Sequence, residues 1–294
     1  MDREHYMDGL LKGASAFTIW GLLPLYWKLV SAINPYEIFA QRVVWSFVFV
    51  GLILVYKGRI ATFCKVIASP KQWIQILLPS FFISVNWLVY IWSVNNGYVI
   101  ETSLGYYINP LVLTLFGSLF FKERLTGLQK IGIGFAAVGV VLKTVMYGSV
   151  PVIALVLAIS FAVYGLLKKK SNLDSLTGLG FETLVVGIPS FAYLIWAESG
   201  GHGIVGNLQP TFWLLIALSG IVTAIPLLLY AEGTKKLPLN VVGFLQYIAP
   251  TIGLILGIFV FKEPFDFKSL SAFLLIWVGL VFFSYSQYKL LSAR

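Results

Sequence analysis

The sequence predicts an all-α membrane protein with ten transmembrane helices, arranged as two inverted repeats of five helices each. Three observations support this fold class. Of the 294 residues, 59% are hydrophobic and only 11% are charged, whereas a soluble domain has about 25% charged residues. The apolar residues form ten runs of the length that a bilayer requires, and a segment of the first half of the chain recurs in the second half. This composition excludes a soluble enzyme and any large domain outside the membrane.

The ten apolar runs are bounded by charged residues, Gly, Pro or Asn, and none alternates polar and apolar residues as the strands of a membrane barrel do. The N-terminus is polar and contains acids, and no small-residue cleavage site follows the first run, so we expect that run to be retained as a helix. Connections as short as Asn34-Pro35 make the flanking helices antiparallel neighbours. We expect helices at 10–33, 36–56, 72–95, 99–121, 127–146, 149–167, 179–197, 211–231, 238–261 and 269–288.

The basic residues are distributed unevenly over the connections. The termini and the even-numbered connections carry 16 of the 21 Lys and Arg residues, the odd-numbered connections carry 4, and Arg42 lies within a span. Positive charge near helix ends stays on the cytoplasmic side, so both termini are predicted to be cytoplasmic. This topology accounts for the net charge of +9, and we expect no nucleic-acid partner.

The sequence lacks the residues that disulfides, zinc sites and hydrolytic active sites need. A single cysteine, Cys64, cannot form an internal disulfide, and the two histidines His5 and His202 are too few and too far apart for a usual zinc site. All four Asp residues lie outside the predicted spans, and no Ser/His pair or HExxH motif is present. We therefore expect no enzyme activity, no catalytic residues, no metal site and no cofactor.

An internal repeat relates the two halves. Sliding the chain so that residue 99 falls on residue 239 aligns 99–142 with 239–282 at ten identities in 44 positions, including an ungapped Tyr-Ile-x-Pro followed by Phe-Lys-Glu. A slightly larger shift aligns Phe17 with Phe161 and Glu37 with Glu182. We predict one repeat over residues 1–146 (helices 1–5) and another over residues 147–294 (helices 6–10), together forming one transport domain. Because five is odd, the second repeat enters the membrane inverted, and such folds place a substrate site near the midplane.

Several segments resemble the RarD branch of the EamA drug/metabolite transporter (DMT) superfamily, over nearly the whole chain. They are Trp20-Gly21-Leu22-Leu23-Pro24-Leu25-Tyr26-Trp27-Lys28, Gln41-Arg42-Val43-Val44-Trp45-Ser46, Gly105-Tyr106-Tyr107-Ile108-Asn109-Pro110-Leu111, Thr223-Ala224-Ile225-Pro226-Leu227, Leu237-Pro238-Leu239 and Gly243-Phe244-Leu245-Gln246-Tyr247-Ile248-Ala249-Pro250-Thr251. The resemblance implies a ten-helix inner-membrane permease with two inverted EamA-type repeats and a central cavity, of the kind described for chloramphenicol sensitivity or resistance. The residue before Arg42 is commonly His in this branch and is Gln41 here, which weakens a proton-relay role at this position.

Candidate binding residues lie first in the second predicted span. Glu37, Gln41 and Arg42 sit one to two turns inside it, where an ionised side chain costs about 2.5–3.5 kcal/mol and needs a watery cavity or a partner. In one interpretation Arg42 binds an anionic group of the substrate, or a carboxylate that exchanges with it. In the other, Arg42 forms a salt bridge or a carbonyl clamp that holds two helices together.

Further polar residues extend this candidate site. Asn86, Tyr90 and Ser93 form one stripe on the third predicted helix, and polar residues precede a proline in the fourth and ninth helices. These residues either line a cavity or form hydrogen bonds between helices. Such an interhelical hydrogen bond is worth roughly 0.6 kcal/mol on average. The predicted substrate-binding residues are Arg42, Glu37, Gln41, Asn86, Tyr90, Tyr107, Asn109, Gln246 and Tyr247.

The sequence therefore predicts a secondary transporter of the cell membrane that exports a small organic solute, a metabolite or a drug such as chloramphenicol, by alternating access through a central cavity. The expected partners are that solute, the lipid bilayer and a coupling ion such as a proton. Both a monomer and a homodimer are compatible with the sequence. The alternative is a membrane sensor or assembly subunit without transport activity.

Overall fold

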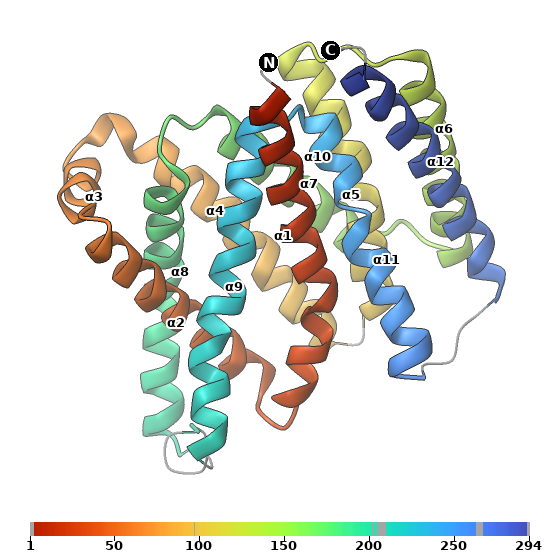
Figure 1. Cartoon of the computed structure of the whole chain (residues 1–294). Coiled ribbons are helices and arrows are strands. Elements are labelled where there is room, and N and C mark those ends of the chain that lie inside the picture. Colours follow the sequence, from red (N-terminus) through yellow and green to blue (C-terminus); the bar gives the residue numbers. More distant parts are fainter. Residues whose placement is uncertain (1–2, 97, 202, 205–209, 263–266, 293–294) are drawn as a thin grey trace.

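The computed structural model describes residues 3–96, 98–201, 203–204, 210–262 and 267–292, and this part of the chain contains helices and no strand (Figure 1). The all-α fold predicted from the apolar runs is thus confirmed. The elements are α1 (Arg3–Leu29), α2 (Pro35–Tyr56), α3 (Ile60–Ile67), the short 3-10 helix η1 (Pro70–Gln72), α4 (Trp73–Asn95), α5 (Val99–Phe121), α6 (Gly127–Tyr147), α7 (Val152–Lys170), α8 (Ser175–Ser199), α9 (Pro210–Lys236), α10 (Leu239–Leu245), α11 (Ile248–Ile255), the π-helical turn η2 (Leu256–Val260) and α12 (Phe267–Ser292).

Nine segments of the described chain are long and apolar enough to cross a membrane, and α1 is the tenth long helix. Charged residues at both ends, among them Asp8, Lys12 and Lys28, lower the mean hydropathy of α1. Its 27 residues nevertheless span about 40 Å at 1.5 Å per residue, and it packs along α9 and α11. The ten expected helices therefore correspond to α1, α2, α4 to α9, the segment from α10 to η2, and α12.

The ninth expected helix is interrupted between α10 and α11. The amide of Tyr247 bonds to the carbonyl of Phe244, and that of Ala249 to Gln246, so the hydrogen bonds here join residues three apart. Pro250 explains the interruption, because it has no N–H and its ring clashes with the carbonyl four residues earlier. The cluster Gln246–Tyr247 therefore lies at a loosened turn within the membrane.

The packing of the helices follows the internal repeat. Two glycines on α6 allow it to touch α12: a Cβ on Gly132 would lie 2.7 Å from the carbonyl oxygen of Gly279, and one on Gly139 would lie 2.7 Å from that of Ala272. The alignment of the repeats places Gly132 on Ala272 and Gly139 on Gly279, so each contact is the repeat equivalent of the other. For this reason α6 and α12 cross on the pseudo-twofold axis. Lys122 and Lys262, which the same shift aligns, share a left-handed φ of 53° and 54°.

The N- and C-terminal ends of the chain lie at the same end of the molecule (Figure 1). Ion pairs join helices at this end. Lys12 contacts Glu232 at 2.7 Å and Asp8 at 2.9 Å, and Asp8 also pairs with Lys236, which joins α1 to α9. Lys168 of α7 forms a more deeply buried ion pair with Glu182 of α8. These contacts join α1 to α9 and α7 to α8.

Asp174 caps the start of α8 at the same end. Its carboxylate accepts hydrogen bonds from the amide and the hydroxyl of Thr177, at 3.1 and 2.6 Å, and lies 2.9 Å from Nη1 of Arg59. Burial alone would raise the pKa of Asp174, but the bonds from Thr177 and the charge of Arg59 outweigh burial and hold the pKa below its usual value.

Candidate functional site

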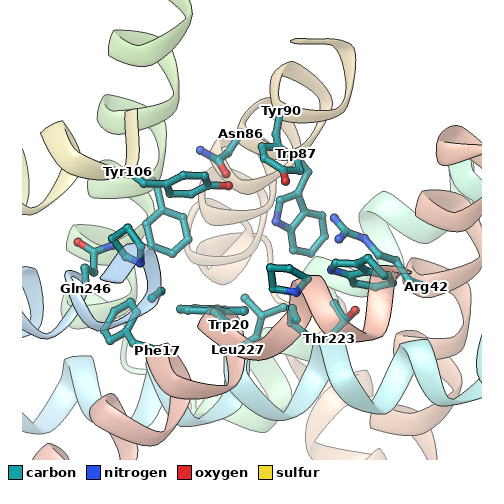
Figure 2. Close-up of a pocket in the computed structure, with 16 residues that line it drawn as sticks. Phe17, Trp20, Arg42, Asn86, Trp87, Tyr90, Tyr106, Thr223, Leu227 and Gln246 are labelled. Carbon is teal, nitrogen blue, oxygen red and sulfur yellow. The ribbon is translucent and has the colours of Figure 1, made fainter. Parts of the chain in front are cut away.

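A cavity of about 280 Å³ lies in the middle of the bundle and is lined by helices of both repeats. The wall is aromatic over much of its area (Figure 2). The lining residues are Phe17, Trp20, Leu23, Pro24 and Trp27 of α1, Arg42 of α2, Asn86, Trp87 and Tyr90 of α4, Tyr106 of α5, Phe161 of α7, Thr223 and Leu227 of α9, Gln246, and Ala249 and Pro250 of α11.

Positions that the repeat makes equivalent face this cavity together. The alignment of the two halves places Phe17 on Phe161 and Tyr106 on Gln246, and all four residues belong to the lining. The cavity therefore lies where the two repeats meet. Arg42 has no charged counterpart, because the equivalent position in the second repeat is Gly187.

Arg42 reaches the cavity from the first half of α2, whose start is capped by Asn34. The guanidinium carbon lies 5.7, 5.1 and 5.3 Å from the ring centres of Trp27, Phe39 and Trp87. Such cation–π contacts offset part of the cost of burying the charge. Nε of Arg42 is buried and has no hydrogen-bond partner in the part of the chain that the structure describes.

The close crossing of α2 and α9 holds Arg42 in place. A Cβ on Gly220 would clash with the carbonyl carbon of Trp45, so the two backbones touch. One turn after Arg42, the hydroxyl of Ser46 lies 2.6 Å from the carbonyl oxygen of Arg42 and 3.1 Å from that of Gly220. A larger residue at position 220 would separate the helices and displace the guanidinium.

Glu37 and Gln41 are buried but do not line the cavity. A carboxylate oxygen of Glu37 accepts a hydrogen bond from the backbone amide of Ile204 at 3.0 Å. Among the described residues, no ion pair joins Glu37 to Arg42. The salt bridge considered from the sequence is therefore not formed in this structure, because the two side chains leave α2 in different directions.

The predicted residues of α4 and α5 divide between the cavity and the helix contacts behind it. Asn86 lines the cavity and also donates to the carbonyl of Leu157 at 2.9 Å. Asn109 donates to the carbonyl of Ala158 and does not face the cavity. Tyr90 lines the cavity together with Tyr106, whereas Ser93 is buried away from it.

Tyr107 and Tyr247 meet behind the cavity wall. Their ring centres are 6.4 Å apart, and the hydroxyl of Tyr247 donates to the carbonyl oxygen of Tyr107 at 3.2 Å. Neither belongs to the cavity lining; Tyr247 instead borders an apolar groove between α1, α10, α11 and α12. Their neighbour Gln246 lines the cavity, and its Oε1 is buried without a hydrogen-bond partner among the described residues.

Comparison with known proteins agrees with this two-repeat architecture. The model of the EamA-like transporter family matches residues 7–145 and again residues 149–285. The chain belongs to the EamA-like transporter family. It is 45% identical to "Uncharacterized transporter YojE" of Bacillus subtilis (strain 168), over 98% of this chain and 97% of that protein. It is 40% identical to "Protein RarD" of Streptomyces exfoliatus, over 96% of this chain and 89% of that protein, which places it in the RarD branch. One solved crystal structure, 20% identical over 96% of this chain and 98% of that chain, shares the fold with a TM-score of 0.72.

The sequence reasoning did not assign the α1 side of the cavity in this EamA-like protein. Phe17, Trp20 and Trp27 lie three and seven residues apart, so they share one face of the helix. That spacing is a signal that the sequence contains, but an aromatic stripe in a spanning helix fits a lipid-facing belt equally well. Thr223 lies in a segment that resembles the RarD branch, but it was not predicted as a binding residue because a lone threonine in an apolar span does not by itself indicate one.

Proposed function

We propose that this multi-pass membrane protein is a secondary transporter of the bacterial cell membrane that exports a small organic solute by alternating access. Its membership of the EamA-like family and the transporter names of its relatives support transport and argue against enzyme activity. The observation that carries the proposal is the cavity at the meeting of the two repeats, because both repeats supply equivalent residues to one wall. Carriers built from inverted repeats bind their substrates at this position.

The geometry supports a division of roles among the predicted residues. Arg42, Asn86, Tyr90 and Gln246 line the cavity and contact the solute in this proposal. Glu37, Tyr107, Asn109 and Tyr247 hold the helices that form the wall, and Gln41 is buried outside the lining. With a volume at the lower limit of ordinary ligand pockets, the cavity suits a small solute rather than a peptide or a lipid.

The contacts at the terminal end support a conformational cycle. Tyr230 packs on Phe17, Trp20 and Phe161 of the cavity wall, with ring centres 5.2 to 5.8 Å away, and it stacks on Tyr164 at 6.0 Å. Beyond Tyr164 lies the ion pair of Lys168 with Glu182. In the proposed cycle this layer closes the terminal end while the cavity is open to the other side, and a coupling ion such as a proton supplies the energy.

Transport by the purified protein tests the proposal. Metabolites that accumulate in a deletion strain and are depleted in an overproducing strain would first be identified, with chloramphenicol included as a candidate. Each candidate would then be loaded into proteoliposomes, and its exchange across the membrane would be followed with a radiolabel. We expect saturable exchange that is lost in Arg42→Ala. An absence of exchange for every candidate, with correctly inserted protein, would favour the sensor or assembly subunit.

A further inference from the structure

The cavity contains a positive charge without a counter-charge. Of the described residues that line the cavity, Arg42 alone is charged, and none is acidic. Its Nε is buried without a hydrogen-bond partner, and no ion pair of Arg42 is found in the described part of the chain. A guanidinium in a low-dielectric site favours an anion, and its planar fork matches a carboxylate. A bound carboxylate would supply the missing charge.

The walls between the two ends of the cavity favour a flat aromatic group. Trp20 and Trp87 lie on opposite sides of the lining in Figure 2, with Tyr106 beside them. Aromatic rings pack on one another by stacked or edge-to-face contacts, which a saturated ring of the same size cannot reproduce. Four further aromatic residues belong to the lining: Phe17, Trp27, Tyr90 and Phe161.

The end opposite Arg42 offers an acceptor that lacks a donor. Gln246 is 8% exposed, and its Oε1 is buried without a hydrogen-bond partner in the described part of the chain. Figure 2 shows Arg42 and Gln246 at opposite ends of the lining, with Trp20 and Tyr106 between them. A buried amide oxygen without a donor is costly, so a ligand with an N–H or O–H group at this end would satisfy it.

We propose that the solute of the cavity is a small aromatic monocarboxylate that carries a hydrogen-bond donor at the end away from its acid. The carboxylate binds Arg42, the ring lies between Trp20 and Trp87, and the donor binds Oε1 of Gln246. This assignment rests on the proposed transport function, because it takes the cavity as the substrate site.

Five probes separate these contacts, because each is compared with a partner that differs from it by one group. Indole-3-carboxylate has the acid, the flat ring and the N–H donor. Its primary amide removes the charge and its N-methyl derivative removes the donor. Cyclohexanecarboxylate, compared with benzoate, replaces an aromatic ring by a saturated one of the same size. Binding to the purified full-length protein would be measured by isothermal titration calorimetry. We expect the amide to bind at least about tenfold more weakly than the acid, because a charge-assisted pair is lost. The N-methyl acid should bind more weakly than indole-3-carboxylate, and cyclohexanecarboxylate should bind more weakly than benzoate.

Substitutions assign each preference to its residue. In Arg42→Ala the preference for acid over amide should disappear, and Arg42→Lys should recover only part of it. In Gln246→Leu the preference for N–H over N-methyl should disappear while the preference for acid over amide stays. Arg124→Ala, an exposed arginine outside the cavity, serves as the matched control and should bind as the unmodified protein does.

The outcomes separate this proposal from the proposed function. Equal binding of acid and amide, or unchanged discrimination in Arg42→Ala and Gln246→Leu, would overturn the ligand assignment. Failure of the unmodified protein to bind indole-3-carboxylate, alongside saturable exchange of another solute in proteoliposomes, would overturn the ligand assignment and leave the transporter proposal standing. Binding with the expected discrimination but without exchange would overturn transport and retain the site.

Discussion

The ion pair between Lys168 and Glu182 provides a sharp test of how the bundle is stabilised. Nζ of Lys168 lies 2.8 Å from Oε1 of Glu182, and the hydroxyl of Tyr164 donates to Oε2 at 2.8 Å. The side chains of Lys168 and Glu182 are only 4% and 3% exposed, so solvent hardly screens the pair. Because α7 and α8 do not pack along their lengths, this cluster is the main side-chain bridge between them in the described chain.

We expect Lys168→Met to destabilise the protein strongly. The substitution strands a buried carboxylate, and breaking a buried pair on one side costs about 3–5 kcal/mol. At roughly 2–4 °C of Tm per kcal/mol, the apparent Tm would fall by roughly 6–20 °C. Thermal unfolding of the purified protein in detergent, followed by tryptophan fluorescence, would measure this change. Lys170→Met, at an exposed position two residues further along α7, is the matched control and should melt within about 2 °C of the unmodified protein.

A triple substitution distinguishes a lost charge pair from a lost shape. Lys168→Met combined with Glu182→Leu and Tyr164→Phe removes all the polar groups and keeps much of the volume. Replacing a buried ion pair by apolar groups is often neutral or stabilising, so the triple variant should recover most of the lost Tm. A Tm of Lys168→Met equal to that of the control, or a triple variant as unstable as the single one, would refute the reasoning.

Three further expectations concern orientation, packing and pH. Cys64 is exposed, so a membrane-impermeant thiol reagent should label it in inverted vesicles but not in intact cells; labelling from outside would reverse the predicted topology. Gly220→Ala should lower the Tm and the yield of folded protein, at a cost of about 1–3 kcal/mol from forcing α2 and α9 apart, whereas Gly51→Ala, which has open space around it, should change little; equal yields and Tm values would contradict the described crossing. Because the pKa of Asp174 is depressed in the folded state, its carboxylate stabilises the fold above the unfolded pKa of about 3.9, and this contribution is lost as the pH falls through the folded value. Asp174→Asn should therefore lower the Tm at pH 7, with a difference from the unmodified protein that shrinks below about pH 4; a constant difference across pH would show that charge is not its cause.

The secondary structure was predictable because each spanning helix must satisfy its own backbone in lipid. Apolar length therefore locates helices such as α2 and α6 to within a few residues. The break at Gln246 was less visible, since the sequence showed Pro250 but not how far the helix would yield. The first helix shows the converse: its charges reduce its hydropathy, yet packing on α9 and α11 retains it in the bundle.

The sequence by itself determined the number of long helices, the internal repeat and the presence of one arginine deep within a span, because hydropathy, spacing and charge are properties of the chain alone. Only the tertiary structure decided which polar groups share a cavity. Glu37 and Arg42 are five residues apart on one helix, yet Glu37 binds the backbone of Ile204 while Arg42 points among aromatic rings. Likewise Gln246 faces the cavity and Tyr247 turns away from it. The physical reason is that the rotation of each helix about its axis is set by contacts with helices distant in sequence, such as the crossing of Gly220 on Trp45, and no local pattern records those contacts.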